Sequence, residues 1–309
     1  MLINQESQNI QSNSLERHLN KSHRLIENFD SSMNSESLTD EISNNRYFGH
    51  WGVKMSNMLK RFIKINRGIS GYFINKFPNF CHGRRTAAAD FERLLEKLIE
   101  KRGSGPFTIL EIGGIDRPRL KKDLRYRYVG LDVDVNDNCY QIYDEFYVQS
   151  VEEPIPVKAD LIISKAVLEH VPDVSISFQR MYDCLNEAGE MLHLVPCGYH
   201  PYSLATKFVG HKWQRKLIRL LLPPKAAQVR GYKAYYNLCS YSQMKRLVSS
   251  LSPENTSITP YWAAVGYFKF FFPLFLTIAA LNRISEVFCL RQLASYMVVY
   301  LKKYDTPVV

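Results

Sequence analysis

The stretch from Thr108 to Asp134 constrains this chain more than any other. It opens with a short apolar run, Ile109-Leu110, that closes on Glu111 and the pair Gly113-Gly114, and it ends with a second apolar run that closes on Asp132. A parallel strand that ends in glycine, beside a strand that ends in an acid, is typical of a site for a nucleotide-type cofactor. Asp132 follows Gly113 by 19 positions, close to the interval of about 20 residues expected for a carboxylate that binds ribose hydroxyls.

The same stretch excludes two common phosphate sites. A dinucleotide site needs the pattern G-x-G-x-x-G, but the chain reads G-G-I-D-R-P from Gly113, and the G-K-[ST] triplet of a P-loop occurs nowhere. What remains resembles the first motif of the class I S-adenosylmethionine-dependent methyltransferases, whose cofactor carries a ribose but no phosphate. Glu111 and Gly113 match that motif, whereas Ile115 and Arg117 stand where the family has later glycines.

A second motif supports the resemblance. Residues 160–171 read D-L-I-I-S-K-A-V-L-E-H-V, similar to the fourth motif of the methyltransferase branch typified by quinone-biosynthesis enzymes. Strand and helix patterns alternate from a helix at 86–102 to a strand at 190–195. The resemblance implies an α/β fold: a Rossmann-like, seven-stranded class I methyltransferase sheet with helices on both faces and an antiparallel last strand at 294–301. The sequence adds a helical N-terminal extension and helical cap insertions.

The resemblance also implies a cofactor site for S-adenosylmethionine at the carboxyl ends of the strands, built from Glu111, Gly113, Gly114, Asp132, Ser150, Val151, Ser164 and Lys165. In the family's pattern the glycines and Glu111 line the methionine end. Asp132 accepts hydrogen bonds from the ribose hydroxyls, a task that suits a carboxylate because it offers only acceptors. Ser150 and Val151 fall where the family contacts adenine, and Ser164 and Lys165 border the sulfonium and the acceptor cleft.

Methyl transfer needs little acid–base catalysis, because the sulfonium already activates the methyl group. Alignment of the nucleophile, the methyl carbon and the sulfur supplies much of the rate. A general base is needed only for a poor nucleophile such as a hydroxyl. His170 is the first candidate, followed by His193 and His200; the alternative for His170 is a residue that packs or caps locally at the start of a helix. Acceptor-binding loops of this fold follow the fifth strand, where the chain offers Tyr199, His200 and Tyr202.

The rest of the chain divides by composition. Residues 1–45 are rich in Asn, Ser, Gln and Glu and predict a disordered polar tail. Residues 46–84 are basic and aromatic with helical spacing, which predicts a helical extension that either packs on the main domain or presents a basic surface to anionic lipid or nucleic acid. The methyltransferase domain is expected at 85–303, with a cap around 198–238 and an apolar helical insertion at 264–290.

The cap and the insertion bear on the acceptor. From Met191 to Pro253 the chain has no Asp or Glu, while Lys and Arg recur throughout. A helix predicted at 202–222 sets a basic face against an apolar face that holds Trp213, typical of a membrane-surface element or of a lid helix packed on the domain. The apolar run 266–281 is short for a membrane span and is interpreted as a hydrophobic acceptor pocket or a membrane-docking face. The mouth of the cleft is expected to be positive and to favour an anionic acceptor.

Cysteine usage and the amino terminus indicate the setting. Six scattered cysteines contain no C-x-x-C pair, which fits a reducing cytoplasm and predicts no metal site, and residues 1–10 lack the features of a signal peptide. We therefore expect a cytoplasmic enzyme, attached peripherally to the inner membrane if the basic surfaces meet lipid. It would methylate a small or lipid- or glycan-linked, anionic acceptor.

Two alternatives stay open at this point. An RNA methyltransferase would also use the basic belt, although the sequence shows no RNA-binding motif. A non-catalytic binding protein on a methyltransferase scaffold would account for Ile115 and Arg117 in place of glycines.

Overall fold

The computed structural model describes residues 46–82, 86–103, 105–115, 117–209, 232–263 and 265–305. The predicted tail and most of the helix predicted at 202–222 lie outside these ranges. The chain divides into two units, residues 1–61 and 62–309, and every described strand belongs to the second.

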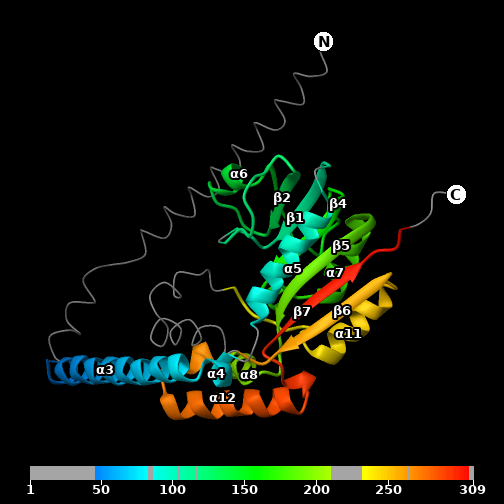
Figure 1. Ribbon diagram of the computed structural model, residues 1–309. Helices are drawn as coiled ribbons and strands as arrows, with labels where there is room; N and C mark the ends of the chain where they lie inside the picture. The colour runs from blue at the N-terminus through cyan, green and yellow to red at the C-terminus, as the bar shows by residue number, and fades with distance from the viewer. Residues whose placement is uncertain are drawn as a thin grey trace. The chain divides into compact units, whose positions relative to one another are not determined.

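Seven strands form one sheet in the order β3-β2-β1-β4-β5-β7-β6 (Figure 1). They are β1 (Phe107–Ile112), β2 (Tyr126–Asp132), β3 (Glu145–Val148), β4 (Ala159–Lys165), β5 (Leu185–Pro196), β6 (Asn255–Tyr261) and β7 (Tyr296–Lys302). β7 pairs antiparallel with both β5 and β6, whereas the other neighbours pair parallel. The predicted class I methyltransferase sheet, with its last strand antiparallel, is confirmed.

The register brings the carboxyl ends of the central strands together. Ile112 of β1 pairs with Leu131 of β2 on one side and with Ser164 of β4 on the other. Both faces of these strands are buried, which is why their sequences are nearly continuous apolar runs. The loops that follow β1, β2 and β4 therefore begin at one edge of the sheet, where ligands bind in open α/β sheets.

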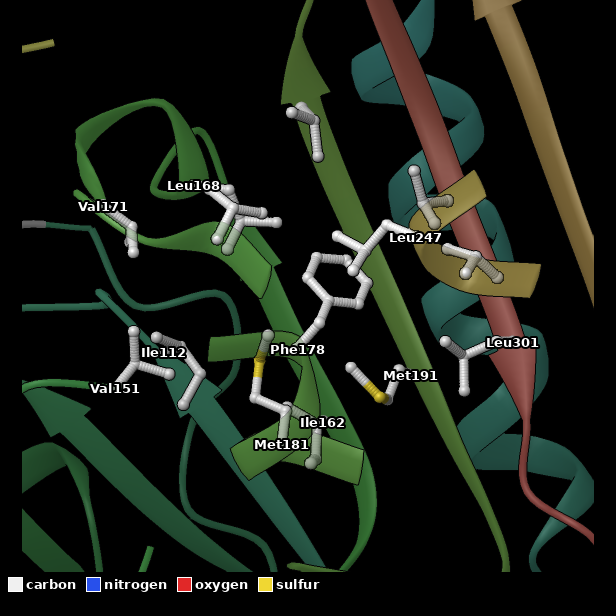
Figure 2. Close-up of a cluster of buried hydrophobic side chains, with 14 of the residues drawn as sticks. Ile112, Val151, Ile162, Leu168, Val171, Phe178, Met181, Met191, Leu247 and Leu301 are labelled. Atoms are coloured by element: carbon white, nitrogen blue, oxygen red, sulfur yellow. The ribbon is translucent and has the colours of Figure 1, made fainter. Parts of the chain in front are cut away.

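Helices cover both faces of the sheet. On one face α5 (Ala87–Lys101) packs through Phe91 and Leu95, and on the other α7 (Val174–Cys184) and α11 (Tyr241–Ser250) pack through residues such as Phe178 and Leu247 (Figure 2). Short side-chain caps fix where the helices begin: the Thr86 hydroxyl accepts the Ala89 N–H at 3.2 Å. A four-residue helix, α6 (Cys139–Ile142), precedes β3.

Five of the remaining elements build a separate apolar cluster. They are α3 (Arg46–Lys76), α4 (Pro78–His82), α8 (Pro201–Val209), α12 (Phe272–Val287) and the 3₁₀ turn η2 (Gly266–Phe268). The 3₁₀ turns η1 (Leu168–His170) and η3 (Arg291–Leu293) lie outside this cluster, and Leu168 of η1 belongs to the core of the sheet. Ile74 and Cys81 of the extension pack against Phe275 and Ile278 of α12. The predicted helical extension and the helical insertion between the last two strands are confirmed. Within the described ranges, no helix is both long enough and apolar enough to cross a membrane.

Candidate active site

A cavity of about 650 Å³ opens at the carboxyl edge of the sheet. Its walls come from the loops that follow β1, β2, β3 and β4 and from the segment Tyr232–Tyr235. The volume lies in the range of about 300–1,000 Å³ that is usual for small-molecule sites.

Gly113 makes the turn at the end of β1, where any side chain would be strained. Its φ is +77°, a left-handed conformation that side chains disfavour, and a Cβ at this position would overlap the side chain of Val167. The Gly113 N–H donates to the Leu131 carbonyl at 2.8 Å, so the turn is tied to β2. Gly114 lies behind it, where a Cβ would overlap the Tyr143 hydroxyl and the Glu111 carboxyl group.

Glu111 is held by three donors from within the protein. Its Oε2 accepts hydrogen bonds from the Tyr128 hydroxyl, from the Tyr143 hydroxyl at 2.9 Å and from the Arg119 N–H at 3.2 Å. The residue is 2% exposed, and burial raises the pKa of its carboxyl group. Glu111 also lines the cavity, and its Oε2 ties the loop after β1, through Arg119, to Tyr128 of β2 and to Tyr143.

Asp132 is the last residue of β2 and also lines the cavity. It is 9% exposed, and its Oδ1 accepts the Asp134 N–H at 3.2 Å. The next strand of the sheet contributes Ser150 and Val151, which also line the cavity, and the Gln149 N–H ties their turn to the Asp132 carbonyl at 3.0 Å. Residues from the ends of β2 and β3 thus form one continuous side of the cavity.

A charged network crosses the wall near Gly113. The Lys165 ammonium lies 2.6 Å from Glu92 Oε1, and the Arg119 guanidinium lies 3.6 Å from the same atom. Arg119 also approaches Glu111, with 3.9 Å between Nε and Oε1. Since α5 supplies Glu92, this helix positions both cationic side chains at the cavity.

His170 reaches the cavity from η1. Its Nδ1 lies 3.0 Å from the Lys233 carbonyl, and because a carbonyl only accepts, Nδ1 carries the proton and Nε2 is the acceptor in the neutral ring. Burial lowers the pKa of the imidazole, whereas the bond to Lys233 raises it by less. Nε2 lies 3.8 Å from Glu169 Oε1, whose pKa burial raises to about 8. A neutral imidazole with an unprotonated Nε2 is therefore favoured at neutral pH.

Six of the candidate residues, including His193, lie outside the cavity lining. Ser164 is buried beside His193, with 2.8 Å between its hydroxyl and Nδ1, because the two residues are register partners in β4 and β5. His200 faces Asn282 of α12 at 3.3 Å, and Tyr202 stacks on Tyr267 with 3.8 Å between ring centroids. Tyr199, half exposed, and Gly114 are also outside the cavity lining. The cavity thus brings together Glu111, Gly113, Asp132, Ser150, Val151, Lys165 and His170.

Several lining residues were not predicted from the sequence. Arg119 carries no motif, and Arg117 was noted only as a departure from a glycine pattern. Three further lining residues, Tyr232, Lys233 and Tyr235, belong to the segment that begins at Tyr232. The Tyr235 N–H donates to the Glu169 carbonyl at 2.7 Å and holds this segment in place. The lack of acids around Lys233 was the one sequence signal for this wall.

These features fit S-adenosylmethionine. The backbone at Gly113 has no Cβ between it and the cavity, a buried carboxylate suits ribose hydroxyls, and Val151 adds an apolar surface for a base. The sheet order and the position of the cavity together define a class I methyltransferase fold.

The sequence comparison identifies the family. A family described as a methyltransferase domain matches residues 81–248, more than half of the chain, and the chain belongs to it. The recognition of a class I S-adenosylmethionine-dependent methyltransferase is thereby confirmed, with S-adenosylmethionine as the family's cofactor; the narrower quinone-biosynthesis-like branch stays a prediction. No curated protein matches the sequence.

Among solved structures, the chain is similar to the CMeT domain of citrinin polyketide synthase, with 13% identity over 70% of this chain and 52% of that chain and a TM-score of 0.42. It is similar to Haemonchus contortus phosphoethanolamine N-methyltransferase 2 in complex with S-adenosyl-L-methionine, with 12% identity, 69% and 52% covered and a TM-score of 0.40. A putative sarcosine dimethylglycine methyltransferase from Galdieria sulphuraria gives 17% identity, 70% and 85% covered and a TM-score of 0.40. The chain spans about half the length of the first two structures.

Proposed function

We propose that the chain binds S-adenosylmethionine in this cavity and transfers the methyl group to a small or lipid- or glycan-linked anionic acceptor. One observation carries the proposal: Gly113, Asp132 and the pair Ser150–Val151 come from three different strand ends and line a single cavity. The positions that the family uses for methionine, ribose and adenine are therefore neighbours here, in the family's order.

In this proposal each wall has one task. Asp132 accepts the ribose hydroxyls, Ser150–Val151 flanks the adenine, and Gly113 lets the methionine end approach the backbone. Lys165 borders the acceptor side of the cavity, where Glu92 holds its ammonium group. When bound, the cofactor supplies a methyl group that its sulfonium has already activated, so that alignment of the acceptor is the protein's main contribution.

The charge of the cavity wall supports an anionic acceptor. Four basic side chains line the cavity, namely Arg117, Arg119, Lys165 and Lys233. Among the lining residues only two carboxyl groups oppose them, Glu111 and Asp132, and Glu92 pairs with Lys165 and Arg119 from outside the lining. The wall therefore carries net positive charge and attracts phosphate or carboxylate groups. We include in the proposal a cytoplasmic location with peripheral attachment to a membrane, where lipid-linked acceptors reside.

His170 is the proposed general base for a hydroxyl acceptor. The bound cofactor would supply the methyl group to the acceptor oxygen, and Nε2 would take the hydroxyl proton, so that the imidazole becomes imidazolium. The hydrogen bond from Nδ1 to the Lys233 carbonyl keeps Nε2 in its acceptor form. Replacement of a general base costs about 10²–10⁴-fold in rate.

Loss of His170 is expected to affect turnover and leave cofactor binding intact. His170→Asn should lower kcat about 100-fold and leave the Kd for S-adenosylhomocysteine unchanged. In the unsubstituted protein kcat should rise with pH and level off, because the basic form of His170 is populated above its pKa. The midpoint should fall below the ordinary histidine value of 6.5, since burial lowers this pKa. An unchanged kcat in His170→Asn would rule out the role.

Arg119 is expected to bind the carboxylate of the cofactor's methionine end. Arg119→Gln should raise the Kd for S-adenosylhomocysteine at least about tenfold, the effect of one lost charge-assisted hydrogen bond. Binding of 5′-methylthioadenosine, which lacks the amino-acid group, should stay within about twofold. Arg125→Gln removes an exposed arginine that pairs with Asp123 and is the matched control. Equal losses for the two ligands would contradict the assignment and indicate a collapsed loop.

The activity itself is tested by S-adenosylhomocysteine formation with a panel of acceptors. The assay tests four kinds of acceptor: anionic lipids, lipid-linked glycans, small phosphorylated or carboxylated metabolites, and mixed RNA. Turnover with an anionic lipid, glycan or metabolite is the expected result. Turnover with RNA alone would favour an RNA methyltransferase, and cofactor binding without turnover on any arm would favour a non-catalytic binding protein.

A further inference from the structure

Helix α12 carries exposed apolar side chains opposite its buried side. Phe275, Ile278, Ala279, Asn282 and Ser285 are buried on the inner side. The outer side holds Leu276, Thr277, Ala280, Leu281, Ile284 and Val287 and is continued by Phe288, and Val287 and Phe288 are each 69% exposed. An exposed face of large apolar side chains is typical of a surface that contacts protein or lipid. No described residue covers this outer side.

Helix α3 carries a second exposed apolar stripe. Ile63, Asn66, Ser70 and Ile74 form the buried side of this helix. Beside them Phe62, Ile65, Ile69 and Tyr72 recur at spacings of three and four residues, and all four are 45% exposed or more. This spacing places them on one face of the helix.

The second half of α3 contacts the segment that leads into α12. The Phe272 N–H donates to Asn66 Oδ1 at 2.9 Å, and the Ser70 hydroxyl donates to the Lys269 carbonyl at 3.2 Å. Phe62 and Phe271, 48% and 39% exposed, touch with 6.2 Å between ring centroids. In Figure 1 the C-terminal end of α3 lies beside the start of α12. We call the exposed residues the helical-pair surface: Phe62, Ile65, Ile69, Tyr72, Phe271, Leu276, Leu281, Ile284, Val287 and Phe288.

The charge around this surface has one sign. Within the second unit, residues 62–76 of α3 contain three basic residues, Lys64, Arg67 and Lys76, and no Asp or Glu. Residues 255–285 contain no acid either, and Glu286 forms an ion pair with Arg283. Apolar side chains flanked by cations are typical of helices that lie in the interface of an anionic membrane.

We propose that the helical-pair surface docks on an anionic lipid bilayer, with its apolar side chains in the boundary between headgroups and acyl chains. A protein interface carries about one hydrogen bond per 100–200 Å². On the outer side of α12, Thr277 has the one polar side chain, and its hydroxyl already donates to the Pro273 carbonyl at 3.0 Å. Nucleic acid would use the cations but gains little from an aliphatic face. Lipid uses both.

This docking rests on the membrane attachment that the proposed function includes but not on methyl transfer, so it is tested without cofactor. The full chain, without cofactor, is floated with phosphatidylcholine vesicles and with vesicles that contain about 30% phosphatidylglycerol, whose negative surface attracts basic segments. We expect binding to the anionic vesicles and weaker binding to the neutral ones. Ile284→Asp with Val287→Asp should lower the affinity at least about tenfold, and Lys64→Gln with Lys76→Gln should lower it about fivefold per charge on anionic vesicles alone.

The matched control is Leu124→Asp with Ile176→Asp, since both residues are exposed apolar side chains outside the helical-pair surface, 106% and 45% exposed. This variant should bind vesicles as the parent does, and far-ultraviolet circular dichroism should show that all variants fold alike. Unchanged vesicle binding in Ile284→Asp/Val287→Asp overturns the proposal. The proposal is also overturned if the folded chain does not bind vesicles, whether or not it binds RNA. It is likewise overturned if the chain forms a dimer in solution that the same substitutions dissociate.

Discussion

Asp132→Ala is expected to weaken binding of S-adenosylhomocysteine by about 100-fold or more. The carboxylate is buried at the end of β2, where it would accept hydrogen bonds from two ribose hydroxyls. Hydrogen bonds to a charged group contribute about 1.5–3 kcal/mol each, and every 1.4 kcal/mol is about a tenfold change in Kd. Isothermal titration calorimetry gives the measurement directly.

The substitution has a matched control in the same loop. Asp137→Ala removes an exposed carboxylate five positions along the chain and outside the cavity lining, so it should leave the Kd within about twofold. Asp132→Asn should fall between alanine and the parent, because an amide retains one acceptor oxygen. Equal binding by Asp132→Ala and the parent would refute the assignment of Asp132 to the ribose.

Gly113→Ala is expected to lower stability and to close the cofactor site together. An alanine at φ +77° costs about 1–2 kcal/mol, and its Cβ would also overlap Val167, so one side chain or the turn must shift. Overpacking adds about 1–3 kcal/mol. Urea unfolding should therefore show a loss of about 2–5 kcal/mol, and S-adenosylhomocysteine binding should fall below detection at micromolar protein.

A second substitution separates the two causes. Val167→Ala removes the side chain that the new Cβ would meet. In the double variant the overlap is relieved while the backbone strain remains, so about half of the lost stability should return. Recovery of the full stability would show that φ contributes nothing, and no recovery would show that Val167 is not the obstacle.

Regular elements with long, periodic sequence patterns were predictable. The helix predicted at 86–102 is α5 (Ala87–Lys101), with Thr86 as its cap, because the apolar spacing and the capping residue agree. The strand predicted at 190–195 extends back to Leu185 as β5, where Ala188 adopts a φ of +57°. The positive φ of Ala188 interrupts the alternation of buried and exposed residues, so the start of β5 was not predicted.

The strand ends that line the cavity were predictable, whereas the irregular segments that line it were not. Gly113 and Asp132 end strands that the apolar runs reveal, so their meeting follows from the parallel register. Arg119 and Tyr235 lie in irregular segments whose course depends on tertiary contacts. His200 was expected at the acceptor but packs against Asn282, because the insertion that holds α12 covers this loop.

The central claim is that this cavity binds the cofactor, and titration of the purified full chain with S-adenosylmethionine and S-adenosylhomocysteine tests it most directly. Binding at one site with a Kd on the order of micromolar, and a higher melting temperature with either ligand, is the expected result. A folded chain that binds neither ligand, and whose melting temperature neither ligand changes, would contradict the account.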